Sequence, residues 1–96
     1  MITHMIMIKW KAPLTEEQLD KVNTGFDALR SGISQIKSMR FGPDLNLGSD
    51  NFHYGMVAEF ASAEDFIGYV EHPRHLEFVS VLLEYAGEAV RTQFGS

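Results

Sequence analysis

The chain has 96 residues, 45% of them hydrophobic, which suits one compact domain, although a chain this short buries only about 60–65% of its unfolded surface. Thirteen acidic and eight basic side chains give a net charge of −5 without a lysine or arginine cluster, which argues against nucleic acid as a partner. The chain has no cysteine, so disulfides, thiolate nucleophiles and most structural zinc sites are excluded.

No apolar run approaches the ~20 residues that a membrane span needs. The opening MITHMIMIKW also lacks the basic region and the cleavage site of a signal peptide. No repeat, low-complexity segment or linker divides the chain. We therefore expect residues 1–96 to form a single cytoplasmic domain that does not contact a membrane.

Residues 2–10 have the two-residue alternation of a β-strand. One side carries Ile2, His4, Ile6, Ile8 and Trp10, and the other carries Thr3, Met5, Met7 and Lys9. Because both sides are mainly apolar, we expect both to be covered.

A helix of roughly 15 residues is predicted after Pro13. Thr15 can cap it and Gln18 can complete a capping box, while Ser31 and Gly32 supply a stop. Its apolar residues recur at helical spacing, at Leu19, Val22, Phe26 and Leu29.

Two strands are expected next. Residues 35–41 form a short candidate, residues 42–51 are rich in turn-forming residues, and residues 52–60 resume strand character. The second strand places Tyr54, Met56, Ala58 and Phe60 on one face.

Ser62 and Asp65 indicate the start of a second helix with Phe66, Tyr69 and Val70 on one side. Pro73 should interrupt this helix near His72, because proline cannot donate to the helix ladder. A further helical stretch follows, and residues 88–94 form a last strand.

The order β-α-β-β-α-β predicts a ferredoxin-like α+β fold, with helices packed on one face of an antiparallel sheet. The helices can cover only one face, while the first strand is apolar on both. We therefore predict a homodimer that packs sheet against sheet.

The chain resembles the stress-responsive A/B barrel (Dabb) domains, which are dimeric α+β barrels. The resemblance covers essentially the whole chain and is carried by ITHMIMIKWK, TEEQLD, FGPDLN, YGMVAEFAS and YVEHPRHLEFV. The element HPRH, residues 72–75, is its most specific part.

This resemblance implies candidate site residues. The family includes a plant cyclase that closes a linear polyketide by a cofactor-free aldol condensation. Its catalytic tyrosine and histidine correspond to Tyr69 and His75, and a first-strand pocket histidine corresponds to His4. A third pocket histidine falls at Tyr54, while His53, one place away, should point to the opposite face.

Each of these residues also has a structural interpretation. His75 is either a general base or a helix-terminal histidine bonded to a backbone carbonyl. Tyr69 either stabilises an enolate or only covers the sheet, and His4 either binds substrate or is a core histidine with its hydrogen bonds satisfied. His72 is expected to make hydrogen bonds where the helix is interrupted.

Metal binding is disfavoured, because His72 and His75 are three residues apart, whereas helical zinc ligands are usually spaced by four. We expect no metal and no cofactor. The first functional hypothesis is a cyclase or carbon–carbon lyase acting on a polyketide-like or aromatic molecule. The alternatives are a non-catalytic, stress-related dimer or carrier of a small apolar or aromatic ligand, and a cofactor-independent monooxygenase.

Overall fold

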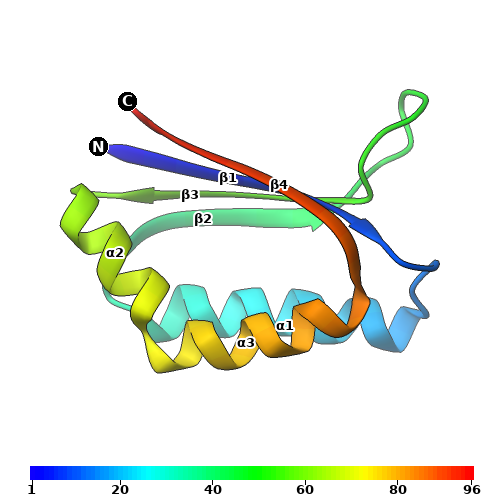
Figure 1. Ribbon diagram of the computed structural model, residues 1–96, viewed down its shortest axis with the longest axis horizontal. Coiled ribbons are helices and arrows are strands. Elements are labelled where there is room, and N and C mark those ends of the chain that lie inside the picture. Colours follow the sequence, from blue (N-terminus) through cyan, green and yellow to red (C-terminus); the bar gives the residue numbers. More distant parts are fainter.

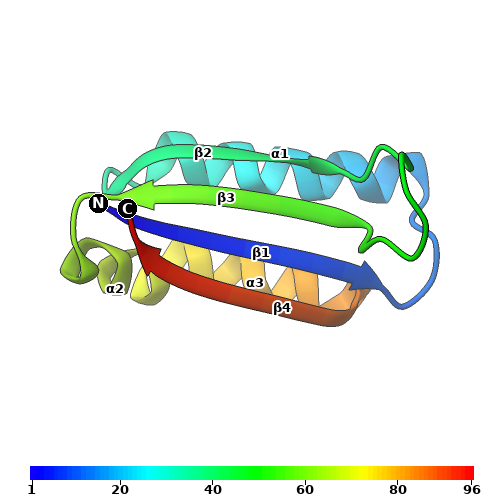
Figure 2. The same ribbon diagram turned by 90° about the horizontal axis from the view of Figure 1, so that it is seen from above.

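The computed structural model describes residues 1–96. It contains one four-stranded antiparallel sheet in the order β2-β3-β1-β4, visible from above in Figure 2. The elements in chain order are β1 (Ile2–Trp10), α1 (Glu16–Gly32), β2 (Ile36–Pro43), β3 (Tyr54–Phe60), α2 (Ala63–Glu71), α3 (Pro73–Tyr85) and β4 (Ala86–Gly95). The predicted ferredoxin-like α+β fold is therefore confirmed.

The molecule has two layers, with all the helices on one face of the sheet (Figure 1). Helices α1 and α3 run side by side beneath the strands, and α2 lies at the end where the two termini meet. Both central strands turn one face toward the helices, and the alternating burial of β3 matches the face that its sequence predicted. Ile8, Met56 and Phe60 are buried there against Val22 and Phe26 of α1.

The helix boundaries follow the sequence signals closely. Thr15 and Gln18 form a complete capping box, in which the Gln18 backbone N–H donates to Thr15 Oγ1 at 3.1 Å and the Thr15 N–H donates to Gln18 Oε1 at 3.0 Å. Pro73 begins α3, and His72 caps that helix by accepting a hydrogen bond from the Arg74 N–H at its Nδ1, at 3.1 Å. The predicted interruption near His72 and its hydrogen-bonding role are both confirmed.

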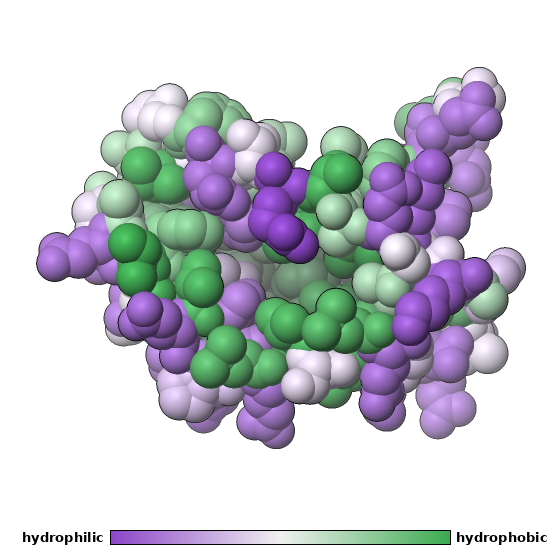
Figure 3. Space-filling model, in the orientation of Figure 1, coloured by the Kyte–Doolittle hydropathy of each residue, from purple (hydrophilic) through white to green (hydrophobic).

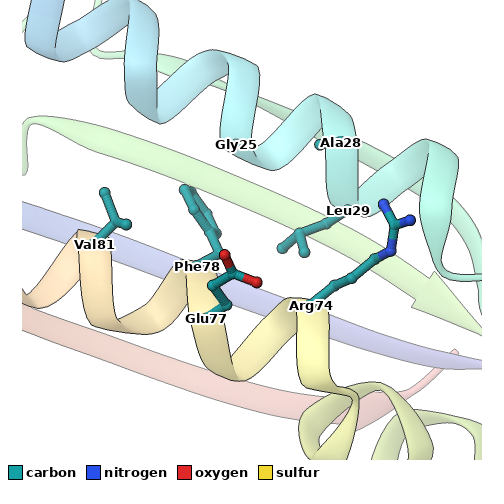
Figure 4. A pocket seen from close by; sticks show the side chains of 7 residues that line it. All are labelled: Gly25, Ala28, Leu29, Arg74, Glu77, Phe78 and Val81. Carbon is teal, nitrogen blue, oxygen red and sulfur yellow. The ribbon is translucent and has the colours of Figure 1, made fainter.

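Helices α1 and α3 approach closely at Gly25. A Cβ atom added to Gly25 would lie 2.0 Å from the Cε1 of Phe78, whose ring packs edge to face on Phe26 with centroids 4.8 Å apart. Figure 4 shows Phe78 reaching from α3 toward this point on α1, beside an outer groove of about 260 Å³ that Leu29 and Arg74 also line. Glycine at this position therefore sets the spacing of the two helices.

The sheet face opposite the helices is open. It exposes Met5 and Met7 of β1 together with Val90 and Phe94 of β4, and Met7 pairs with Val90 across the two strands. Apolar side chains on an uncovered sheet face are typical of an interaction surface. None of the helices has the length and apolar character needed to cross a membrane.

Candidate functional site

A cavity of about 280 Å³ lies between the sheet and the helices, on the side of β1 and β4. In Figure 3 the hollow opens between β4 and α3 with apolar surface around it and strongly hydrophilic atoms at the β4 side. Its lining is mainly hydrophobic, and the polar members are His4, Tyr69, His75, Arg91 and Gln93. The apolar lining residues are Ile6, Ile8, Phe66, Val70, Val79, Leu82, Leu83, Ala86 and Ala89.

His75 lies in the first turn of α3, where the break at Pro73 directs the chain back along the cavity. Its Nδ1 lies 3.0 Å from the Val70 carbonyl oxygen, and because a carbonyl can only accept, Nδ1 is the donor. In the neutral ring, Nε2 then carries the free lone pair. Burial lowers the pKa of His75, which favours this neutral form near pH 7.

Tyr69 lies in the last turn of α2 and is almost fully buried. Its ring centroid is 4.4 Å from that of His75 and 6.2 Å from that of His4, so it lies beside both histidines. Burial raises the pKa of the Tyr69 phenol to about 12. The hydroxyl therefore keeps its proton at neutral pH and can act as a hydrogen-bond donor.

His4 faces the cavity from the middle of the sheet, with 4% of its surface exposed. The Gln93 Nε2 amide donates to His4 Nδ1 at 2.9 Å, which leaves the His4 proton on Nε2. Burial, followed by the nearby His75 and Arg91, lowers the pKa of His4 to about 4. His4 is thus a neutral N–H donor, and its hydrogen-bonded Nδ1 matches the satisfied core histidine that the sequence allowed.

The structure brings together three of the four predicted site residues, His4, Tyr69 and His75. Tyr54 is on the same sheet face but is absent from the cavity lining, and its hydroxyl donates to Asn23 Oδ1 at 2.5 Å. Its buried ring stacks on Phe26 at 5.6 Å. Substrate binding by Tyr54 stays a prediction that this geometry does not support.

His53 also lies away from the cavity, just before β3. Its Nδ1 accepts a hydrogen bond from the Trp10 backbone N–H at 2.9 Å, and its backbone N–H donates to the Ile8 carbonyl at 2.8 Å. These bonds attach the loop before β3 to the end of β1, so His53 has a structural role here.

Arg91 and Gln93 are pocket residues that the sequence reasoning missed. Both are in β4, where Arg91 pairs with Ile6 and Gln93 pairs with His4. The alternation of Ala89, Arg91 and Gln93 was a weak available signal, since these three side chains share one face of the strand.

The polar groups of the cavity are imidazoles, a phenol, an amide and a guanidinium, with no carboxylate or thiolate among them. No group of three or more histidine, cysteine or acidic side chains in the structure is arranged to hold a metal ion. What the cavity offers instead is one imidazole base beside several hydrogen-bond donors.

Comparison with known proteins identifies the fold class first and the family second. The fold is that of a dimeric ferredoxin-like protein of unknown function from Thermobifida fusca, which is 27% identical with a TM-score of 0.92, over 99% of this chain and 90% of that one. The family model named Stress responsive A/B Barrel Domain (Dabb) matches residues 2–94. The chain belongs to this family.

Two relatives in sequence are plant proteins. The stress-response A/B barrel domain-containing protein HS1 of Arabidopsis thaliana is 26% identical over 85% of this chain and 77% of its own length. Olivetolic acid cyclase of Cannabis sativa is 28% identical over 83% of this chain and 81% of its own length.

More distant solved structures share the fold alone. They include a hydroxynitrile lyase from Passiflora edulis, 22% identical over 97% of this chain and 90% of that one with a TM-score of 0.85. They also include SnoaB, a cofactor-independent oxygenase from Streptomyces nogalater, 10% identical over 99% of this chain and 91% of that one with a TM-score of 0.77. The fold thus occurs with cyclase, lyase and oxygenase activities.

Proposed function

We propose that this protein is a cofactor-free enzyme that carries out proton transfer on a polyketide-like or aromatic substrate, by aldol cyclisation or carbon–carbon bond cleavage. The grouping of His4, Tyr69 and His75 around one apolar cavity is the observation that carries the proposal. A neutral base beside a phenol that stays protonated suits enolate chemistry, which uses a proton acceptor and a hydrogen-bond donor to the developing oxyanion.

In the proposed mechanism, His75 Nε2 removes a proton from a carbon flanked by carbonyl groups. The electron pair of the broken C–H bond moves to the neighbouring carbonyl oxygen and forms an enolate. The enolate carbon attacks a second carbonyl of the same substrate, which forms the new carbon–carbon bond and leaves an alkoxide. The alkoxide takes the proton back from His75, so proton and charge balance over the cycle.

Tyr69 and His4 are proposed to hold the developing charge on oxygen. The Tyr69 hydroxyl donates to the enolate oxygen, and its high pKa follows from the same burial that strengthens a hydrogen bond to an anion. His4 binds a substrate oxygen through its Nε2–H, since Gln93 occupies its Nδ1. Both residues act as donors and neither must lose its proton.

The size of the cavity limits the substrate. Ligand sites usually enclose about 300–1,000 Å³, and the cavity of about 280 Å³ is just below that range. A single aromatic ring or a short keto chain fits such a space, and the apolar walls exclude water from the charged intermediate.

We further propose that the 96 residues act as one domain in a cytoplasmic homodimer. Several structures of this fold are described as dimeric, including proteins from Thermobifida fusca, Bacteroides fragilis and Jannaschia. The exposed Met5, Met7, Val90 and Phe94 supply an apolar sheet face that a second copy can cover.

The test of catalysis is turnover of synthetic linear polyketides, supplied both as free keto acids and as thioesters, with ring formation followed by mass spectrometry. His75→Gln and Tyr69→Phe should each lower kcat by about 100-fold or more, the usual contribution of a positioned acid–base or oxyanion group. His53→Gln is the matched control, because His53 lies outside the cavity, and it should retain activity.

Measurements of binding and of oxygen uptake distinguish the two alternatives, a ligand carrier and a monooxygenase. A carrier would bind these compounds without turnover, and His75→Gln would leave its binding and its biological effect unchanged. A monooxygenase would consume oxygen with a quinol-type substrate, whereas a cyclase consumes none. Equal rates in wild type, His75→Gln and Tyr69→Phe would overturn the proposed mechanism.

A further inference from the structure

Arg91 lines the cavity from β4, remains exposed to solvent, and has no acidic partner. The structure contains one ion pair, between Arg30 and Asp27 on α1, and the guanidinium of Arg91 has no carboxylate within salt-bridge distance. Its pairing with Ile6 of β1 places it on the helix side of β4, in the cavity wall. An arginine is always charged, and its planar fork matches the two oxygens of a carboxylate.

The cavity as a whole favours an anion. None of its 14 lining residues is acidic, although the chain has 13 acidic side chains and a net charge of −5. Arg91 is also one of the groups that lower the pKa of His4, so its positive charge acts on the interior of the site. The neutral donors at His4 and Tyr69 add to this preference.

We propose that the ligand of this cavity carries a carboxylate, which Arg91 binds at the β4 side while the uncharged part of the ligand extends to Tyr69 and His75. This inference rests on the proposed function, because it names the substrate class of the same site as an aromatic or keto acid. The lone arginine is an anchoring residue that determines specificity, and it takes no part in proton transfer.

The register of the strands supports this placement. Arg91 and Gln93 are two residues apart on one face of β4, opposite Ile6 and His4. Two residues of a β-strand span about 7 Å. A single aromatic ring or a keto chain of a few carbons bridges that distance, so a carboxylate on Arg91 leaves a carbonyl or hydroxyl oxygen near His4.

A matched pair of probes tests the proposal by binding alone. We would titrate 2,4-dihydroxybenzoate and 2,4-dihydroxybenzamide into wild type, Arg91→Gln, Arg91→Lys and Lys21→Gln, by calorimetry and by NMR of the histidine rings. The two probes differ in charge but hardly in shape. Lys21 is exposed on α1, so Lys21→Gln removes one positive charge away from the cavity.

Wild type and Lys21→Gln should bind the benzoate about tenfold more tightly than the benzamide, as expected for one charge-assisted, partly exposed bidentate contact. Arg91→Gln should lose this preference while binding the benzamide as wild type does, which also shows that the variant is folded. Arg91→Lys should retain part of the preference, because it keeps the charge without the fork.

Equal binding of the two probes by wild type would overturn the proposal, as would a preference that survives in Arg91→Gln. Failure of both probes to bind at about 10 mM would overturn it as well, since such affinity is too weak for a dedicated site. If wild type shows the charge preference but no turnover, only the proposed catalysis is contradicted. The failure of the proposed function and the failure of this proposal are therefore distinguishable.

Discussion

At the scale of single residues, the site depends on keeping its histidines neutral. His4 makes its Gln93 hydrogen bond through an unprotonated Nδ1, and the ring packs at 4.9 Å from Phe66. Protonation at Nδ1 would replace an acceptor with a donor that faces an N–H group. The low pKa of His4 therefore links the hydrogen bonding of the pocket to the stability of the fold.

This linkage predicts a loss of stability in mild acid. The pKa of His4 falls from 6.5 to about 4 on folding, so between these values the unfolded chain binds a proton that the folded chain does not. The free energy of unfolding should decrease by about 2–3 kcal/mol as the pH falls from 7 to 4, with His75 adding in the same direction. Urea unfolding at a series of pH values measures this loss.

His4→Gln is the informative variant for that experiment. Glutamine keeps a polar side chain at the position but cannot titrate, so the slope of stability against pH below 6.5 should become shallower. If the slope is the same in wild type and His4→Gln, the pKa of His4 is not lowered by folding and the pocket is wetter than the structure indicates.

At the scale of elements, the sequence determined the helices well because their signals are local. Thr15 and Gln18 marked the start of α1, and Pro73 marked the break between α2 and α3. The grouping of His4 with Ile6 and Ile8 on one face of β1 was equally clear from its alternation. Each of these features depends on residues within one turn or one strand of each other.

The composition of the site was harder to predict, because it depends on strand order and register. β4 mixes small and polar residues, so hydrophobicity could not assign Arg91 and Gln93 to its inner face before its pairing with β1 was known. Tyr54 was placed on the correct face, but it pairs with Ile8, whereas His4 pairs with Ala58. Ile8 itself lines the cavity, but no residue of β3 does, because the cavity lies on the β4 side of β1 and Tyr54 lies on its β3 side.

The contact of α1 with α3 predicts that Gly25→Ala is destabilising. Alanine is the better helix former by about 1 kcal/mol, yet its Cβ would fall within 2.0–2.8 Å of three atoms of the Phe78 ring. We expect a net loss of about 1–3 kcal/mol, as for other overpacked contacts. Thermal and urea unfolding of the variant measure it.

Gly68→Ala is the control for that prediction. The new Cβ would meet only the Gln35 amide, at 3.3 Å, and this side chain can move aside. The gain in helix propensity should then dominate and stabilise α2 by about 0.5–1 kcal/mol. Equal effects of the two substitutions would mean that Phe78 does not restrict the spacing of the helices.

At the scale of the whole molecule, one sheet serves two purposes through its opposite faces. The helix side of β1 and β4 holds His4 and Arg91 in the cavity, while the other side of the same strands presents Met7 and Val90. A small chain buries only a limited fraction of its own surface. Covering the second face in a dimer would add buried surface, and it would also stiffen the strands that form the pocket wall.

This arrangement predicts that Met7→Lys weakens the dimer. Met7 is 46% exposed in the isolated chain, and a lysine there would place two like charges near each other across an interface between identical sheet faces. The mass from light scattering after size-exclusion chromatography should change from that of two chains in wild type toward that of one.

Ile67→Lys is the control, since Ile67 is 53% exposed but lies on α2, away from the open face, and its variant should remain dimeric. A monomeric wild type, or a Met7→Lys variant as dimeric as wild type, would show that the open sheet face is not where two copies meet.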